Sequence, residues 1–412
     1  MTSIPDLSNL LPALRLVVVT TFFPNSADPH RTPFVKNLVK ALKAVSELNV
    51  IAPVAIAPVW LSGRRWARLH NVPDREQIDG IDVQHPKFLV LPKMSWFSGF
   101  GYFLAVRPYL SRLKHEGRSL LVHAHCGYPD AVGVAIACRL LKLPYVVTLH
   151  GSDINVYAEK LLLRPQIRWA LKHASGIVAV SSALLSKAGK MMQSNTQLTC
   201  IPCAGFDPDL FFVRDQKTAR ESLGIEQGKR VVVYVGHLVP IKAVDTLVKA
   251  WAIRKAGAAG FEDLLVIVGA GECRPELEAQ AEQEDVRDSM KFTGVVPQAE
   301  VSGWIAAADV LCLPSRNEGM PNVVVEALAS GVPVVASRVG GIPELICDGK
   351  NGLLVEVDRP DDLANALGQA LNQVWSRDEI RKSVEDLTWS RLAARNLDFF
   401  RSLQPAATGH NA

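Results

Sequence analysis

The fold of this chain is decided by a stretch in its second half, which reads Val310-Leu-Cys-Leu-Pro-Ser-Arg-Asn-Glu-Gly-Met-Pro-Asn-Val-Val-Val-Glu326. It begins with the apolar run Val310–Leu313 and a loop, and it continues through a helical pattern over Asn322–Ser330 to a second apolar run, Val332–Ser337. Near-continuous Val, Ile and Leu runs are typical of parallel strands whose sheet is covered by helices on both faces. The stretch therefore predicts one unit of a doubly wound sheet.

The same alternation of strand-like and helical patterns extends over most of the 412 residues. Further strands are expected at Leu14–Thr20, Leu48–Ala52, Leu120–Ala124, Tyr145–Leu149, Ile177–Val180, Arg230–Val235 and Leu264–Val268. Helices are expected at Phe34–Ala44, Ala131–Leu141, Ala243–Ala256, Pro275–Glu284 and Val301–Ala307. The predicted fold class is α/β, with two Rossmann-like doubly wound domains that face a central cleft at the carboxyl ends of their strands.

The boundary between the two domains is expected at the turn-rich segment Ile201–Asp209. Residues 1–205 carry 23 Lys and Arg against 11 Asp and Glu, whereas residues 206–412 carry 22 against 30. A basic N-terminal half fits an anionic partner such as a lipid surface or a polyphosphate. The prediction is an N-terminal domain of residues 1–205, a C-terminal domain of residues 206–385, a helix of residues 386–403 that packs back on the N-terminal domain, and a disordered tail of residues 404–412.

Composition narrows the class of protein. Hydrophobic residues make up 48% of the chain and charged residues 21%, which excludes disordered and fibrous chains. The longest apolar stretch, Leu48–Leu61, is too short to span a bilayer, and no basic region precedes the first apolar run. Seven cysteines, an odd number, indicate free thiols in a reducing compartment. We therefore expect a cytoplasmic protein.

Two glutamates, Glu318 and Glu326, stand eight residues apart across the junction of a loop and a helix. Gly319 and Pro321 shape the loop, and the first backbone N–H groups of the helix have no intrahelical partners. These groups suit sugar hydroxyls or phosphate oxygens, and Glu326 could accept two hydrogen bonds from a ribose diol. The alternative is that both carboxylates only favour the helix N-terminus through its dipole.

A second candidate follows the strand expected at Arg230–Val235. Gly236 lets the backbone approach a ligand closely, and Lys242 is expected to open the next helix. A cation beside the positive end of a helix makes an anion site that suits a diphosphate. Alone, the pattern is more often that of a surface lysine on an ordinary loop.

Taken together and in order, these pieces resemble the donor domain of the family 4 (group 1) retaining glycosyltransferases, which have the GT-B fold. The motifs that carry the resemblance are Gly236-x5-Lys242, Val268-Gly-Ala-Gly-Glu272, Phe292-Thr-Gly-Val295, Ala308-Asp-Val-Leu-Cys-Leu-Pro-Ser315, Glu318-x7-Glu326, Glu326-Ala-Leu-Ala-Ser-Gly-Val-Pro-Val-Val-Ala336 and Gly340-Gly-Ile-Pro-Glu344. They span about 120 residues, which makes the set far more specific than any one member.

The resemblance implies a role for each motif. Lys242 would bind the donor diphosphate and stabilise the leaving group, Glu326 would hold the ribose, and Glu318 would contact the transferred sugar. Glu344 is a weaker candidate on the donor side. The donor-binding residues expected on this basis are Gly236, His237, Lys242, Gly294, Val295, Glu318, Gly319, Met320, Pro321, Asn322 and Glu326.

The chain departs from the family pattern at two positions. His237 replaces the usual arginine after the strand-end glycine, and a neutral imidazole cannot match a permanently charged, bidentate guanidinium. Ala243 replaces the usual glycine after the lysine. Weaker donor binding, or a stronger pH dependence, is the expected consequence.

Histidines end two of the expected strands in the first half, in His123-Ala-His125 and in His150-Gly-Ser-Asp153. Each could simply bond a neighbouring loop. The family resemblance places His125 near the transferred sugar, so the catalytic candidates are His125, Lys242 and Glu318. Candidates on the acceptor side are Arg31, Thr32, His150 and Asp153.

Aromatic and basic residues also alternate in the first half, in Trp60–Arg68 and in the region from Phe88 to Arg118. Such stretches suit peripheral contact with the inner face of an anionic membrane, but they are more often a solvated basic face over core aromatics. Nucleic acid is not expected as a partner.

Three short motifs are interpreted as decoys. Asp207-Pro-Asp209 lies in the expected linker, where Asp and Pro make turns, so no metal is assigned. Cys200-Ile-Pro-Cys203 has no second half for a zinc site. Gly269-Ala-Gly271 lacks the third glycine of a dinucleotide fingerprint, so no cofactor is expected and a nucleotide-diphosphate sugar serves as co-substrate.

The function predicted on these grounds is a retaining, metal-independent glycosyltransferase that moves a sugar from a nucleotide-diphosphate sugar to a saccharide or lipid-linked acceptor in surface polysaccharide synthesis. The alternatives are a sugar-nucleotide epimerase of the same architecture and a non-catalytic protein that binds nucleotide sugars.

Overall fold

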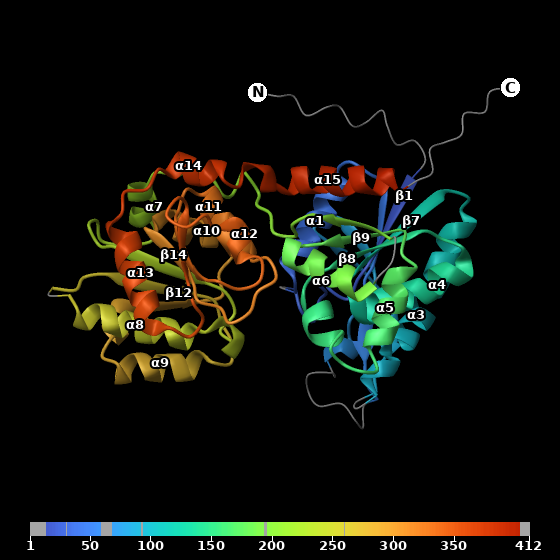
Figure 1. The fold of residues 1–412 in the computed structure, drawn as a ribbon, viewed down its shortest axis with the longest axis horizontal. Coiled ribbons are helices and arrows are strands. Elements are labelled where there is room, and N and C mark those ends of the chain that lie inside the picture. The colour runs from blue at the N-terminus through green and yellow to red at the C-terminus, as the bar shows by residue number, and fades with distance from the viewer. Residues whose placement is uncertain are drawn as a thin grey trace. The chain divides into compact units, whose positions relative to one another are not determined.

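The structure is a computed structural model that describes residues 14–29, 31–58, 68–91, 94–192, 196–258 and 260–403. The expected tail of residues 404–412, and residues 60–67 of the aromatic and basic stretch, lie outside the described residues. The chain divides into two compact units, one made of residues up to Cys203 together with Trp389 onward, the other of Ala204–Thr388 (Figure 1). The expected α/β class is confirmed, because each unit is built on a largely or wholly parallel sheet.

The first unit holds an eight-stranded sheet in the order β10-β9-β8-β7-β1-β2-β5-β4, in which only the β4–β5 pair is antiparallel. Its strands are β1 (Leu14–Val19), β2 (Leu48–Ile51), β4 (Arg75–Ile78), β5 (Ile81–Gln84), β7 (Ser119–His125), β8 (Tyr145–Leu149), β9 (Gly176–Ala179) and β10 (Gln197–Cys200), and a separate pair is formed by β3 (Val54–Ile56) and β6 (Lys87–Leu89). Its helices are α1 (Pro33–Lys43), α3 (Ser98–His115), α4 (Val132–Leu141), α5 (Arg164–Lys172), α6 (Ser182–Met192) and α15 (Trp389–Ser402). The last helix, α15, packs against α1 within this unit.

The second unit holds a six-stranded parallel sheet in the order β13-β12-β11-β14-β15-β16, which is the strand order of the Rossmann fold. The strands are β11 (Val231–Val235), β12 (Leu264–Val268), β13 (Met290–Gly294), β14 (Val310–Leu313), β15 (Val334–Ser337) and β16 (Gly352–Val355). The helices are α7 (Gln216–Ser222), α8 (Val244–Ala256), α9 (Arg274–Gln283), α10 (Gln298–Ala307), α11 (Asn322–Ala329), α12 (Ile342–Leu345), α13 (Pro360–Asn372) and α14 (Arg377–Lys382). Helices flank this sheet on both faces (Figure 1), with α8, α9 and α13 grouped together and α7, α10, α11 and α14 grouped together.

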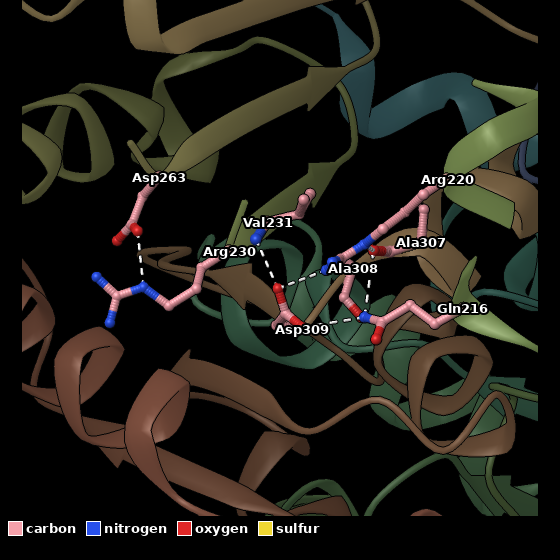
Figure 2. Close-up of polar contacts among 8 residues, drawn as sticks. All are labelled: Gln216, Arg220, Arg230, Val231, Asp263, Ala307, Ala308 and Asp309. Carbon is pink, nitrogen blue, oxygen red and sulfur yellow. Dashed lines mark hydrogen bonds and ion pairs between the residues drawn. The ribbon is translucent and has the colours of Figure 1, made fainter. Parts of the chain in front are cut away.

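A polar network around Asp309 holds the amino-terminal ends of β11 and β14 together (Figure 2). One carboxylate oxygen of Asp309 accepts hydrogen bonds from the backbone N–H of Val231 at 2.6 Å and from the guanidinium of Arg220 at 2.8 Å. Arg220 and Gln216, both on α7, also donate to the carbonyl of Ala307 at the end of α10. The network therefore satisfies groups at a helix end that would otherwise have no partner.

Candidate functional site

The predicted donor residues follow the two strands, β11 and β14, at which the strand order of the second sheet reverses. Gly236 comes directly after β11, and Pro314 directly after β14. In open α/β sheets, ligands bind outside the carboxyl ends of the strands at this switch point. The topology therefore brings the two segments predicted from sequence to the same edge of one sheet.

The loop after β11 packs main chain to main chain on the loop after β12. The N–H of Gly236 donates to Val268 at 3.0 Å, and the N–H of Leu238 donates to Ala270 at 3.0 Å. A Cβ on Gly269 would lie 1.9 Å from the Gly236 carbonyl oxygen, and one on Gly271 would lie 2.1 Å from that of Leu238. The two glycines of the rejected dinucleotide motif are thus required by this close approach.

His237 lies in the same loop with an exposed side chain, while its carbonyl accepts a hydrogen bond from the hydroxyl of Tyr234 at 3.0 Å. Gly294 ends β13 with a φ of 79°, and its carbonyl accepts from the N–H of Gly269 at 2.9 Å. The next residue, Val295, is exposed. A backbone hydrogen bond thus connects the end of β13, where the predicted donor residues Gly294 and Val295 lie, to the loop that follows β12.

Lys242 does not open the following helix, which corrects one expectation. It ends a 3-10 turn, Pro240–Lys242, and α8 begins at Val244. Its ammonium contacts Glu318, with 2.5 Å between Nζ and Oε1, and the hydroxyl of Ser315 donates to the same oxygen at 2.7 Å. Two of the predicted catalytic residues are therefore in direct contact.

Ala243 separates this turn from α8 and has a φ of 50° and a ψ of 38°, in the left-handed region. Non-glycine residues pay about 1–2 kcal/mol for this conformation, which gives a physical reason for the glycine that is usual in the family. Replacing Ala243 by glycine is therefore expected to raise the free energy of unfolding by about 0.5 kcal/mol, since part of the relief is offset by the entropy of the unfolded chain.

Thermal and urea denaturation measure this change. The matched control is Ala252→Gly within α8, which is expected to lower the free energy of unfolding by about 1 kcal/mol. A loss of stability in both variants would contradict the interpretation of Ala243 as strained.

The loop that carries Glu318 is held by two further glycines. A Cβ on Gly340 would lie 1.8 Å from the Glu318 carbonyl oxygen, and the N–H of Gly341 donates to Gly319 at 2.7 Å. Met320 and Pro321 are buried below the loop. The Gly-Gly-Ile-Pro-Glu motif therefore supports the Glu318 loop by close packing, and its Glu344 is exposed on the short helix α12.

Glu326 lies on α11 and is 8% exposed. Its carboxylate accepts a hydrogen bond from the amide of Gln298 at 3.5 Å. Among the described residues, Oδ1 of Asn322, on the first turn of the same helix, is buried with no partner. Burial raises the pKa of Glu326 to about 7, partly offset by the Gln298 contact. Helix α11 thus buries two polar groups that could bind a ligand. They are the carboxyl of Glu326, which has spare hydrogen-bonding capacity, and the unsatisfied amide oxygen of Asn322.

The raised pKa of Glu326 predicts a pH dependence of stability. Because the folded state holds this proton more tightly than the unfolded state, whose pKa is near 4.5, ionisation between pH 4.5 and about 7 favours unfolding. The Glu326→Gln variant is expected to lose less stability than the wild type as the pH rises through this window.

Thermal melts at closely spaced pH values test this expectation, with Glu282→Gln, an exposed carboxyl on α9, as the control. Parallel curves for the wild type and Glu326→Gln would show that the carboxyl is not protonated in the folded protein.

In the first unit, three imidazoles gather at the ends of β7 and β8. Nδ1 of His125 lies 3.1 Å from Nε2 of His150, and the ring centroids of His123 and His125 are 4.2 Å apart. Burial lowers the pKa of His123 and of His150 to about 3 and holds that of His125 well below its usual range. All three rings are therefore neutral at pH 7, so His125 would contact a sugar by hydrogen bonding and not by charge.

Asp153 and the loop after β1 have structural partners. The carboxylate of Asp153 accepts four backbone N–H bonds, from Gly127, His150, Gly151 and Ile154, which shapes the loop after β8. Burial raises the pKa of Asp153, and these bonds offset part of that rise. Thr32 precedes α1 and its hydroxyl donates to the carbonyl of Phe22. Burial raises the pKa of Asp130 to about 7, and the charge of Arg31 offsets part of that rise.

Each unit thus gathers its own set of predicted residues. The donor candidates meet at one sheet edge of the second unit, and His125, His150 and Asp153 meet in the first. An ion cluster beside Lys242, formed by Arg316, Asp245 and Asp358, was not predicted from the sequence. The available signal was an arginine between two motif residues, Ser315 and Glu318.

Within the described part of the chain, no group of three or more His, Cys, Asp or Glu side chains could hold a metal ion.

Two doubly wound units, each built on a parallel or largely parallel sheet, are the architecture of the GT-B glycosyltransferase class. Residues 215–386 match the family described as glycosyl transferases group 1, and residues 71–210 match glycosyltransferase family 4. The chain belongs to the group 1, family 4 glycosyltransferases.

Two bacterial relatives agree with this membership. The chain is 30% identical over 393 residues to the glycosyltransferase TuaC of Bacillus subtilis, whose description names teichuronic acid biosynthesis; the match covers 90% of this chain and 94% of TuaC. It is 33% identical over 309 residues to a D-inositol 3-phosphate glycosyltransferase of Nocardioides, and the match covers 68% of this chain and 67% of that protein.

Solved structures share the fold at lower identity. Sucrose-phosphate synthase from Thermosynechococcus elongatus matches with a TM-score of 0.71 at 19% identity, over 94% of this chain and 99% of that one. Anabaena Alr3699/HepE in complex with UDP-glucose matches with a TM-score of 0.67 at 21% identity, over 95% and 100%. The predicted GT-B fold is confirmed by these matches.

Proposed function

We propose that this glycosyltransferase transfers a sugar with retention of anomeric configuration, and without a metal ion, from a nucleotide-diphosphate sugar to a saccharide or lipid-linked acceptor in surface polysaccharide synthesis. The contact between Lys242 and Glu318 at the switch point carries the proposal. An ammonium there neutralises the departing diphosphate, and a carboxylate beside it contacts the sugar that the diphosphate carries. TuaC and the HepE complex with UDP-glucose support the acceptor and donor classes.

We propose the following reaction. The acceptor hydroxyl oxygen bonds to the anomeric carbon, the bond from that carbon to the β-phosphate oxygen breaks, and the acceptor proton passes to the diphosphate. Lys242 stabilises the negative charge that develops on the diphosphate. Glu326 fixes the ribose, so the second unit acts by positioning and electrostatic stabilisation.

The donor is identified by thermal shift against a panel of nucleoside diphosphates and their sugars, because a ligand that binds only the folded state raises the melting temperature. NMR of the product then reports its anomeric configuration. Inversion would overturn the retaining assignment. An epimer formed from donor alone would indicate an epimerase, and binding without turnover across acceptors would indicate a binding protein.

The Glu326→Ala variant is expected to raise the KM for the donor while changing kcat little, because the ribose is bound equally in the ground state and the transition state. The loss corresponds to about 1.5–3 kcal/mol, the contribution of hydrogen bonds to a charged group. Steady-state kinetics measure it, and an unchanged donor KM would remove Glu326 from the site.

We further infer that the first unit contacts an anionic membrane through one face of α3. Phe97, Phe100 and Leu104 follow each other at helical spacing, are 42%, 43% and 54% exposed, and are joined by Trp96 on the preceding turn. The helix carries Arg107, Arg112 and Lys114 and no acidic residue. Exposed aromatics beside basic residues are typical of membrane-surface helices. Among the described residues, no helix is both long and apolar enough to cross a membrane.

Sedimentation with lipid vesicles tests this contact. We expect binding to vesicles that contain phosphatidylglycerol, little binding to pure phosphatidylcholine, and loss of binding when Phe97, Phe100 and Leu104 are all replaced by serine. Leu140→Ser, an exposed leucine on α4, is the control. Equal binding by the triple variant would place the contact elsewhere.

A further inference from the structure

The Arg316 side chain forms hydrogen bonds with three separate segments of the second unit. Its guanidinium donates to both oxygens of Asp245 at 3.1 and 2.8 Å and to both oxygens of Asp358 at 2.8 and 3.1 Å. It also donates to the carbonyl of Pro240. Asp245 lies on the first turn of α8, and Asp358 lies in the loop between β16 and α13. One side chain thus connects the turn before α8, α8 itself and a loop distant in sequence.

The main chain of Arg316 makes a further contact with the same turn. Its N–H donates to the carbonyl of Ile241 at 2.8 Å. The residue after Ile241 is Lys242, and two residues after Arg316 comes Glu318, whose carboxylate meets the Lys242 ammonium. The backbone of Arg316 and the side chain of Glu318 therefore form hydrogen bonds with Ile241 and Lys242, two successive residues of one short turn.

We propose that Arg316 is a positioning residue for the donor site: by anchoring the Pro240–Lys242 turn to α8 and to the loop at Asp358, it fixes the place of the Lys242 ammonium relative to Glu318. The proposal rests on the proposed function, since it assigns Lys242 to the donor diphosphate. Arg316 does not itself touch the donor, because its guanidinium is engaged by the two carboxylates and the Pro240 carbonyl.

The chemistry of the cluster suits a fixed anchor. A planar guanidinium with five donors can hold two carboxylates in bidentate contacts and a carbonyl at once, which a lysine cannot do. Asp358 is itself held by the hydroxyl of Thr246 at 3.2 Å. The Arg316 contact holds the pKa of the Asp358 carboxyl below its usual range, so the pair stays charged at neutral pH.

The test compares donor affinity in four proteins: the wild type, Arg316→Gln, Lys242→Ala and the double variant. The probe is the nucleoside diphosphate that gives the largest thermal shift with the wild type, and calorimetry gives its Kd. We expect Arg316→Gln to raise the Kd about tenfold. In the Lys242→Ala background the same change is expected to alter the Kd less than about twofold, because residues that act through one contact are not additive.

Arg230→Gln is the matched control. Arg230 makes an ion pair with Asp263 at 2.7 Å and a hydrogen bond with Asn372 at 3.1 Å, next to the opposite end of β11, so its loss tests a purely structural effect. The Kd of the Arg230→Gln variant for the nucleoside diphosphate is expected to remain within about twofold of the wild-type value. Asp358→Asn is expected to raise the Kd in the same direction as Arg316→Gln, and thermal melts confirm that each variant is folded.

The outcomes separate this inference from the function on which it rests. Wild-type affinity in a folded Arg316→Gln variant, or full additivity with Lys242→Ala, would overturn the positioning role and leave the donor site intact. If the wild type binds no nucleoside diphosphate, the donor assignment and the positioning role fall together.

Discussion

Replacing Lys242 by alanine is expected to lower kcat by about two to three orders of magnitude, the usual loss when one preorganised charge contact to a transition state is removed. The ammonium lies 2.5 Å from Glu318 at the switch point of the second sheet. Its removal takes away the charge that we propose faces the leaving diphosphate. Steady-state and single-turnover kinetics measure the effect, with the donor at saturation.

The control for this variant is Lys255→Ala, which removes a lysine near the far end of α8, where it pairs with Asp285. Its kcat is expected to remain near that of the wild type. If Lys242→Ala retains wild-type kcat and donor KM, the ammonium has no part in the reaction, and the proposed donor site is wrong.

Replacing Asp309 by alanine is expected to lower the free energy of unfolding of the second unit by about 3 kcal/mol, as for a largely buried ion pair that loses one partner. The change leaves the guanidinium of Arg220 without its carboxylate, and the Arg220 side chain is only 9% exposed. It also removes the acceptor for the N–H of Val231 at the start of β11. Urea denaturation followed by circular dichroism measures the shift.

The control is Glu356→Ala, because the Glu356 side chain is 70% exposed and lies 3.5 Å from Arg338. Exposed pairs of this kind contribute less than about 1 kcal/mol. Equal shifts in Asp309→Ala and Glu356→Ala would show that the Asp309 network is not a stabilising element.

The strands of the two sheets could be predicted closely where both faces are buried. Three strands have the predicted bounds, namely Tyr145–Leu149, Leu264–Val268 and Val310–Leu313. An unbroken apolar run is typical of a strand whose sheet is covered on both faces, because every side chain of the run is then buried. The strand β16 and the helix α3 were not predicted. β16 is only four residues long, and α3 contains Pro108 and exposes aromatic residues on one face. Neither segment therefore shows a clear period of apolar residues in the sequence.

The candidate site was predictable in part for a similar reason. The Glu318-x7-Glu326 spacing and the Gly236-x5-Lys242 spacing each lie within one loop and its helix, so local sequence records them. The Arg316 cluster joins segments more than forty residues apart, and Asp309 binds residues on α7 and β11. Such contacts depend on strand order, which no local pattern encodes.

The sequence by itself determined that this chain builds two doubly wound α/β units and places glutamates, a lysine and histidines just after buried strands, because apolar periodicity and turn residues are local properties. Only the tertiary structure decided that β11 and β14 are neighbours, that Lys242 therefore meets Glu318, and that Arg316 anchors the turn between them. The physical reason is that a parallel sheet brings together strand ends far apart in the chain, where short-range charge and hydrogen-bond contacts can form.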